Sequence, residues 1–98
     1  MKIGVSSSAF NDLQAIIDYY DQEGVPYIGR QLAADIIGHI QVLSEHPDMG
    51  RVVPEFQLNY IREIIHEPFR VVYLREEQSI TVIRVWRSER LLVLPHET

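Results

Sequence analysis

The sequence contains no cysteine, and its single lysine is Lys2. A chain without cysteine cannot build disulfides, thiolate zinc sites or iron–sulfur ligation, and it has no thiol nucleophile. Uninterrupted apolar runs are short, as at residues 91–94, so we expect no membrane span. The N-terminus also lacks the long apolar stretch of a signal peptide. Together these absences predict a cytoplasmic protein.

The 98 residues suffice for one small domain, which we place at residues 1–98. An apolar fraction of 46% is too high for intrinsic disorder. A core of this size is nevertheless thin, and an obligate partner would help to stabilise it.

Charge is distributed unevenly along the chain. The net charge is −5, and all of it arises in residues 1–50, which carry two basic and seven acidic side chains. Residues 51–98 carry seven arginines and seven glutamates. The acidic total argues against nonspecific nucleic-acid binding. The arginine-rich half suits contacts with carboxylates or phosphates, because the guanidinium fork binds such groups in bidentate fashion.

The first half of the chain predicts two helices. Apolar residues recur every three or four positions, at Phe10, Leu13, Ile16, Ile17 and Tyr20 in the first helix and at Ile28, Leu32, Ile36, Ile40 and Leu43 in the second. The serines at 6–8 are suited to cap the first helix. Pro26 suits the first turn of the second. The short connection between the helices predicts an antiparallel hairpin.

The second half changes to strand-like segments. Residues 60–65, 69–75 and 80–86 are rich in β-branched and aromatic side chains. Residues 1–5 predict a short first strand, residues 52–56 an extended segment, and residues 91–94 a last strand or an ordered tail. The order β-α-α-β-β-β predicts an α+β fold, with an antiparallel sheet covered on one face by the helical hairpin.

No standard catalytic or cofactor motif is present, neither a glycine-rich phosphate loop nor the HExxH or GxSxG pattern. His39 and His46 are seven residues apart on the second helix, which separates them by about 10 Å. That distance is too long for two ligands of one metal. We therefore expect no metal site and no cofactor.

Arginines cluster on the predicted strands. Arg70 and Arg84 lie on consecutive strands, Arg62 precedes them, and Arg87 and Arg90 follow. Arginines on one open face of a sheet could bind a phosphate backbone or an acidic segment of a partner. The alternative is that Arg70 and Arg84 each pair with a local carboxylate, such as Glu63 or Glu67. Arg62 and Glu63 could likewise form a structural ion pair.

Four segments of the second half carry a resemblance to a known family. They are Gly-Arg-Val-Val-Pro-Glu at 50–55, Tyr-Ile-Arg-Glu-Ile at 60–64, Phe-Arg-Val-Val-Tyr at 69–73 and Ile-Thr-Val-Ile-Arg-Val-Trp-Arg-Ser-Glu-Arg at 80–90. Preceded by a helical hairpin, this ordered set resembles the RelE/ParE superfamily of type II toxin–antitoxin toxins, and its ParE branch in particular. The resemblance implies a small toxin held inactive by a cognate antitoxin.

Within that superfamily, RelE-like members cut messenger RNA on the ribosome, whereas ParE-like members poison DNA gyrase. Arg70 matches the strand arginine of the ribonucleases, and Glu55 could serve as a base. Ile61, Glu63 and Leu94 stand where the ribonucleases carry two lysines and a tyrosine, and Ile61 and Leu94 can neither stabilise charge on phosphate nor move protons. The ribonuclease site is thus incomplete.

The resemblance therefore predicts a ParE-like toxin that acts by binding gyrase, with no catalytic residues and no direct nucleic-acid contact. One alternative is a ribosome-dependent endoribonuclease with Glu55 and Arg70 at its centre. Another is an inactive relative that only binds a partner. The residues expected to contact the target or the antitoxin are Arg51, Glu55, Arg62, Arg70, Arg84, Arg87 and Arg90.

Overall fold

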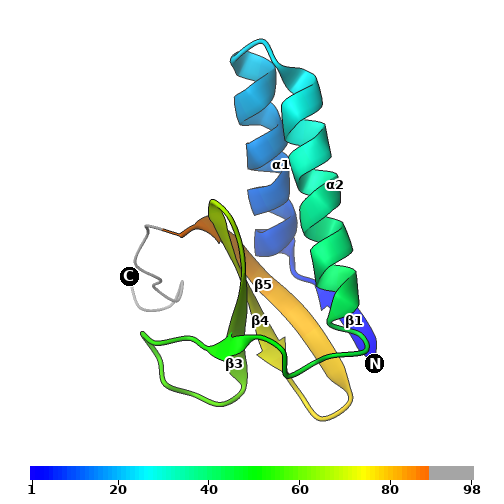
Figure 1. The fold of residues 1–98 in the computed structure, drawn as a ribbon, viewed down its shortest axis with the longest axis vertical. Helices are drawn as coiled ribbons and strands as arrows, with labels where there is room; N and C mark the ends of the chain where they lie inside the picture. Colours follow the sequence, from blue (N-terminus) through cyan, green and yellow to red (C-terminus); the bar gives the residue numbers. More distant parts are fainter. Residues whose placement is uncertain (89–98) are drawn as a thin grey trace.

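The computed structural model describes residues 1–88 and shows a helical hairpin packed against one face of a five-stranded sheet (Figure 1). The predicted α+β class is confirmed. In chain order the elements are β1 (Lys2–Val5), α1 (Ser7–Gln22), α2 (Pro26–Val42), β2 (Arg51–Val52), β3 (Ile61–His66), β4 (Phe69–Arg75) and β5 (Ser79–Arg87).

The sheet has the order β1-β5-β4-β3-β2. The pairs formed by β2 through β5 are antiparallel, as predicted, but β1 pairs with β5 in parallel, so the sheet is mixed. The expectation of a purely antiparallel sheet was wrong at this edge. The chain returns to β1 only after the hairpin and three further strands, and a long crossover of this kind permits parallel pairing.

The predicted segments differ from the observed elements mainly at their ends. Residues 69–75 form β4 as expected, and the neighbouring strands are displaced by a residue or so. The extended segment expected at 52–56 is wrong. The strand comprises only Arg51–Val52, the Val53 N–H makes one more bond to the Ile61 carbonyl, and the chain then turns, with the Phe56 N–H donating to the Val53 carbonyl. Pro54 has no N–H to continue the ladder. Residues 91–94 lie outside the described part.

Ser6 caps α1 and also ties it to the sheet. Its Oγ accepts a hydrogen bond from the Ala9 N–H at 3.1 Å, which confirms the predicted cap. The same hydroxyl donates to the Ile83 carbonyl at 3.1 Å, and the Ser6 N–H donates to Val82 at 2.9 Å. The start of the helix is thereby held against β5.

The main core lies between the hairpin and the sheet. Leu13 and Ile16 of α1 and Ile36 and Ile40 of α2 pack on the strands. The prediction that Phe10 belongs to the buried stripe of α1 was wrong. Phe10 is 63% exposed, whereas its neighbour Ala9 is fully buried. Ala9 continues the i, i+4, i+7 series of Leu13 and Ile16, and Phe10 is one step off that series.

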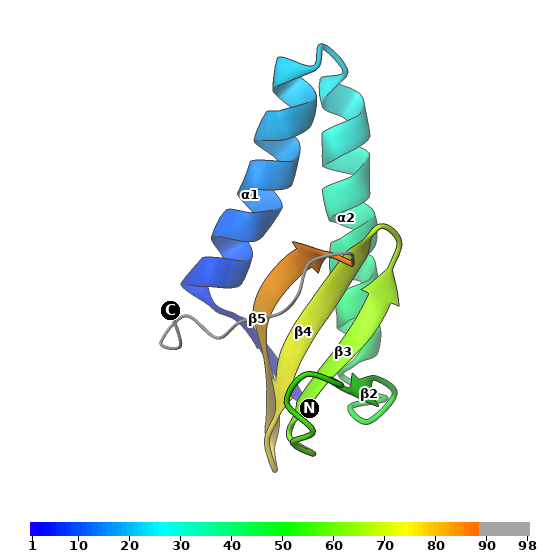
Figure 2. The ribbon, with the colours of Figure 1, turned by 90° about the vertical axis from the view of Figure 1, so that its left-hand side faces the viewer.

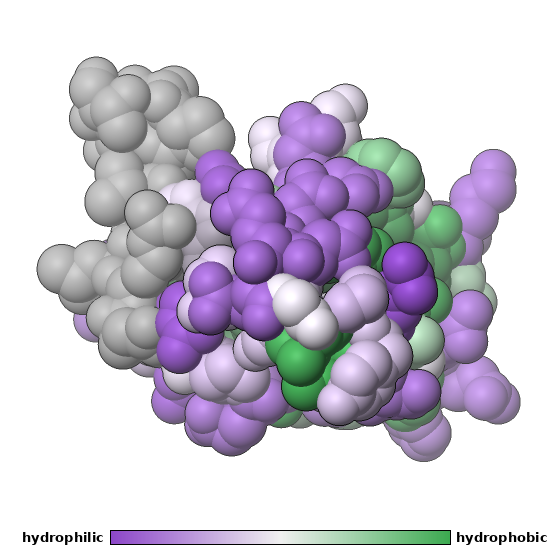
Figure 3. All heavy atoms as spheres, turned by 90° about the horizontal axis from the view of Figure 1, so that it is seen from above, coloured by the Kyte–Doolittle hydropathy of each residue, from purple (hydrophilic) through white to green (hydrophobic). Residues whose placement is uncertain are grey.

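The tip of the hairpin extends past the ends of the strands (Figure 2). Ile28, predicted as part of the buried stripe of α2, is accordingly 39% exposed. Seen end-on from the tip, the surface of the described residues is mostly hydrophilic, with smaller hydrophobic areas between (Figure 3). No helix within residues 1–88 is long and apolar enough to cross a membrane.

A second, smaller core covers the opposite face of the sheet. Val53, Ile61 and Val72 are buried there, with Phe56 and Trp86 packed against them. The segment between β2 and β3 supplies Val53 and Phe56. The sheet face that the sequence suggested would be open is therefore partly closed by this segment.

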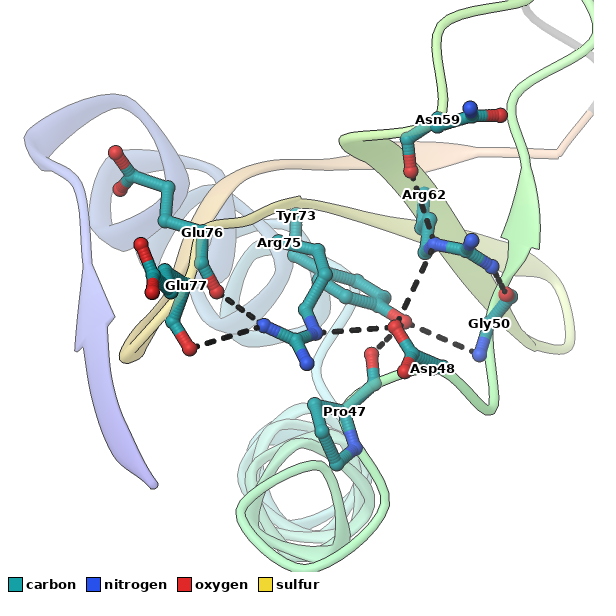
Figure 4. A network of polar contacts seen from close by, with 9 residues as sticks. All are labelled: Pro47, Asp48, Gly50, Asn59, Arg62, Tyr73, Arg75, Glu76 and Glu77. Atoms are coloured by element: carbon teal, nitrogen blue, oxygen red, sulfur yellow. Dashed lines mark hydrogen bonds and ion pairs between the residues drawn. The ribbon is translucent and has the colours of Figure 1, made fainter.

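A network of polar contacts fixes the turn between α2 and β2 to the sheet (Figure 4). The hydroxyl of Tyr73, which is fully buried, donates to the Pro47 carbonyl at 2.8 Å and accepts from the Gly50 N–H at 3.1 Å. Arg75 donates to the Asp48 carboxylate at 3.0 Å. Burial is the main cause that raises the pKa of Tyr73. The Tyr73 hydroxyl thus bridges the two ends of the turn, and Arg75 adds a further contact from the sheet.

We predict that Tyr73→Phe lowers the free energy of unfolding by about 1–3 kcal/mol, because it leaves the Gly50 N–H and the Pro47 carbonyl without their partner. Urea denaturation followed by circular dichroism measures the change. Tyr27→Phe is the matched control, since Tyr27 is 68% exposed and its change should stay within about 0.5 kcal/mol. Equal stability of the two variants would contradict the assigned role of Tyr73.

Candidate functional site

Four charged side chains form a neutral network on the sheet face opposite the hairpin. We call Arg51, Glu55, Glu63 and Arg70 the arginine–carboxylate network. Arg70 donates from its two terminal nitrogens to Glu55 at 2.7 and 2.8 Å, and from Nε to Glu63 at 2.7 Å. Arg51 donates from Nε to the other oxygen of Glu63 at 2.6 Å. Two arginines and two glutamates thus alternate in one chain of contacts.

Strand register brings the network together. Arg51 of β2 lies opposite Glu63 of β3, and Glu63 lies opposite Val72 of β4, two residues from Arg70 on the same face. Glu55 comes from the segment that covers this face. The arginine whose side chain remains largely exposed is Arg51, at 62%, whereas Glu63 is fully buried and Arg70 is 7% exposed.

Burial and pairing determine what this network can do. Removing two charges from water is costly unless they are paired and hydrogen-bonded, and Arg70 and Glu63 are paired with each other through a hydrogen bond of 2.7 Å. Hydrogen bonding to Glu55 is the largest cause that raises the pKa of Arg70, with Glu63 adding to it. Arg70 therefore stays charged, and its guanidinium is already occupied by two carboxylates of its own chain.

Arg62 lies on the other face of β3, toward the hairpin. It donates to the Gly50 carbonyl at 2.9 Å and to the Asn59 carbonyl at 3.0 Å, and lies 3.9 Å from Asp48. The alternative of an Arg62–Glu63 ion pair was wrong, because successive residues of a strand point to opposite faces.

Arg84 reaches around the edge of β5 to α1. It donates to both carboxylate oxygens of Asp12, at 2.8 and 2.9 Å, and its guanidinium lies 4.1 Å from the ring centroid of Trp86. Asp12 also accepts from the Val85 N–H at 2.9 Å. One aspartate thereby satisfies an arginine and a backbone group of the strand edge.

A hollow of about 460 Å³ opens between α1 and the ends of β4 and β5. Four of the nine residues that line this aromatic hollow carry aromatic rings, and the guanidinium of Arg87 lies 5.8 Å from the ring centroid of Phe69. The residues that line it are Asp12, Ala15, Ile16, Tyr19, Tyr20, Phe69, Val85, Trp86 and Arg87. Such a shape suits an apolar side chain rather than a phosphate.

The predicted arginine surface is divided between two sides of the sheet. Arg51, Arg70 and Arg84 belong to the face that also carries Val72, whereas Arg62 and Arg87 lie opposite Tyr73 and Phe69 on the hairpin face. Arg90 lies outside the described residues. Glu55, which was predicted as a contact residue together with the arginines, accepts hydrogen bonds from Arg70. Their roles in binding stay predictions.

Asp12 is a site residue that the sequence patterns did not single out. A signal for it exists, because Asp12 is three residues after the buried Ala9 and four before the buried Ile16. That spacing puts it beside the apolar stripe. A carboxylate there can reach the sheet edge.

His39 of α2 and His66 of β3 form a further polar contact, with their Nδ1 atoms 3.1 Å apart. Burial lowers the pKa of His39, and the neighbouring imidazole of His66 lowers it further. Within residues 1–88, no three histidine, aspartate or glutamate side chains gather as a metal-binding group.

Comparison with known proteins agrees with this architecture. The model of the family described as "ParE toxin of type II toxin-antitoxin system, parDE" matches residues 3–92. The chain belongs to the ParE toxin family. It is thus a toxin of the type II toxin–antitoxin class, and the predicted resemblance to the ParE branch is confirmed.

Solved structures share the fold of this ParE family member. A chain described as the chromosomal ParDE toxin–antitoxin system from P. aeruginosa is 24% identical, with a TM-score of 0.77, and the match covers 91% of this chain and 97% of that one. A conserved hypothetical protein from Helicobacter pylori is 13% identical, with a TM-score of 0.50 and coverage of 94% and 99%. A search of curated proteins finds no match.

Removal of Glu63 should destabilise the fold strongly. We predict that Glu63→Ala lowers the free energy of unfolding by about 3–5 kcal/mol, because it leaves the buried Arg70 with an incomplete set of partners. Arg51→Ala deletes the exposed end of the same network and should cost below about 1 kcal/mol. Urea denaturation of the two variants measures both changes in the free energy of unfolding. A similar decrease in the two variants would contradict the role of Glu63 as the buried partner of Arg70.

The histidine contact predicts a pH dependence. The pKa of His39 is lower in the folded protein than its ordinary value of 6.5 in the unfolded chain, so the unfolded chain binds the proton more readily. The free energy of unfolding should therefore fall as the pH drops below 6.5. His39→Asn should lose less stability between pH 7.5 and 5.5 than the unmodified chain, as measured by urea titrations at both pH values. His46→Asn is the control and should behave like the unmodified chain. The same loss in all three proteins would refute this prediction.

Proposed function

We propose that this protein inhibits DNA gyrase by binding it, without cleaving RNA, and that a cognate antitoxin neutralises it. Its membership of the ParE toxin family makes an antitoxin partner the expected state of the chain. The choice between gyrase and the ribosome depends on the chemistry of the arginine–carboxylate network.

The observation that carries the proposal is the bidentate contact between Arg70 and Glu55. A ribonuclease centred on these residues needs a guanidinium that can reach a phosphate and a carboxylate that can accept a proton. Here each group occupies the other, at 2.7 and 2.8 Å, and the Arg70 side chain is 7% exposed. RNA binding would have to break this pair and its contact with Glu63, which supports a structural role for the pair.

Charge supports the same conclusion. A protein with a net charge of −5 is repelled by the phosphate backbone unless a basic surface is concentrated locally. The described arginines do not form such a surface, since they are divided between two faces and Arg51, Arg70 and Arg84 are each bound to a carboxylate. A protein surface is the more suitable partner for this arrangement.

Two of the predicted contact arginines are exposed enough to reach a partner directly, Arg51 at the exposed end of the network and Arg87 at the aromatic hollow. We propose that they contact the target or the antitoxin. Arg62, Arg70, Arg84 and Glu55 then act from within, by holding the turn, the covering segment and the strand edge in place.

Purified gyrase provides the decisive experiment. We expect the protein to abolish supercoiling of relaxed plasmid, and the cognate antitoxin, added in equimolar amount, to restore it. Ribosomes programmed with a defined messenger RNA should yield no cleavage products in the presence of the same preparation. If supercoiling stays intact and the messenger RNA is cleaved, the target is the ribosome and not gyrase. If the protein binds its antitoxin but shows neither activity, it is an inactive relative.

The exposed arginines can be tested separately from the fold. We predict that Arg51→Ala combined with Arg87→Ala weakens gyrase inhibition at least about tenfold, since each charged contact contributes about 1.5–3 kcal/mol. Thermal unfolding should change by only a few degrees. Arg30→Ala, an exposed arginine on α2, is the matched control and should inhibit normally. Full inhibition by the double variant would remove both residues from the contact surface.

A further inference from the structure

His39 and His66 meet across the junction between the hairpin and the sheet. They are 27 positions apart in sequence, and their Nδ1 atoms are 3.1 Å apart, with ring centroids at 5.3 Å and ring planes inclined by 55°. Both residues are partly exposed, so solutes can reach them. Nothing in the toxin function described above uses this pair.

The geometry points to a site for a borderline divalent cation such as Zn²⁺, bound by the Nδ1 atoms of His39 and His66. In a tetrahedral zinc centre with Zn–N bonds of about 2.0–2.1 Å, two neighbouring nitrogens lie about 3.3 Å apart. The observed separation of 3.1 Å differs from that by a few tenths of an ångström, which a small ring rotation supplies. Each ligand is mounted on a regular element, one near the end of α2 and one at the end of β3.

The proton balance of binding is simple. A hydrogen bond between the two Nδ1 atoms requires a hydrogen on one of them. Coordination by both Nδ1 atoms requires that this ring takes its other neutral tautomer, with the hydrogen on Nε2, so two neutral imidazoles bind without a net loss of protons. When either ring is protonated, a proton must leave first, and acid therefore competes with the metal.

The donor set also determines which cations fit. Two imidazole nitrogens suit Zn²⁺, Cu²⁺ and Ni²⁺, whereas Mg²⁺ and Ca²⁺ require oxygen ligands. Since residues 1–88 gather no third side-chain ligand, water completes the coordination shell. A metal at this position links α2 to β3, so its binding free energy adds to the stability of the folded chain.

The test is thermal unfolding of the untagged full chain at pH 7.5, with ZnCl₂ titrated from zero to millimolar concentration. We expect a saturable rise in Tm, at least about 5 °C once zinc exceeds its Kd a hundredfold, which EDTA reverses and MgCl₂ does not reproduce. His39→Ala and His66→Ala should each lose this rise, whatever their own Tm in the absence of metal. His46→Ala, which keeps the pair, is the matched control and should respond fully.

Two further measurements separate the site from adventitious binding. The ¹⁵N resonances of the Nδ1 atoms of His39 and His66 should shift with zinc, while those of His46 remain in place. At pH 5.5 the zinc-induced rise in Tm should disappear. The proposal is overturned if zinc leaves Tm unchanged, or if the rise survives in His39→Ala and His66→Ala. Because gyrase inhibition plays no part in these measurements, either proposal can fail without the other.

Discussion

The buried guanidinium of Arg70 is the constraint on which this sheet depends. A charged side chain that is only 7% exposed is tolerable only when carboxylates compensate it, and Glu55 and Glu63 do so from two directions. The observed register of β2 and β3 also brings Arg51 to the second carboxylate oxygen of Glu63. Glu55 draws the segment after β2 across the sheet, where Val53 and Phe56 enclose the second core. Arg70 thus joins β4 to β3 and to the covering segment, and Arg51 extends the network to β2.

A single carboxylate has a comparable role at the other edge of the sheet. Beyond Val82, β5 is no longer paired with β1, because the chain turns into α1 at Ser6. There the Ser6 hydroxyl donates to the Ile83 carbonyl, and the Asp12 carboxylate accepts from the Val85 N–H. These side chains replace the hydrogen bonds that a further strand would have made. Exposed edge groups invite pairing with other chains, so this edge is partly protected by α1 itself. The aromatic hollow lies beside it.

Sequence patterns predicted most elements, yet they described the site less well. The hairpin, the capping serine and β4 follow from periodicity, hydroxyl chemistry and β-branched residues, all of which act within one element. The division of the arginines between two faces follows from register, which a single strand does not reveal. His39 was compared with His46, its neighbour on the same helix, although its contact is with His66 on a strand.

By itself, the sequence determined the class of fold, the family and the kinds of charged group available, because these depend on local periodicity, composition and ordered motifs. Only the tertiary structure decided that β1 joins the sheet in parallel, that Arg70 is enclosed rather than exposed, and that Asp12 serves the edge of β5. The physical reason is that a charged side chain acquires its role from its partners. Those partners, 7 and 15 positions from Arg70 and 72 from Arg84, become neighbours only when the sheet and the hairpin have packed together.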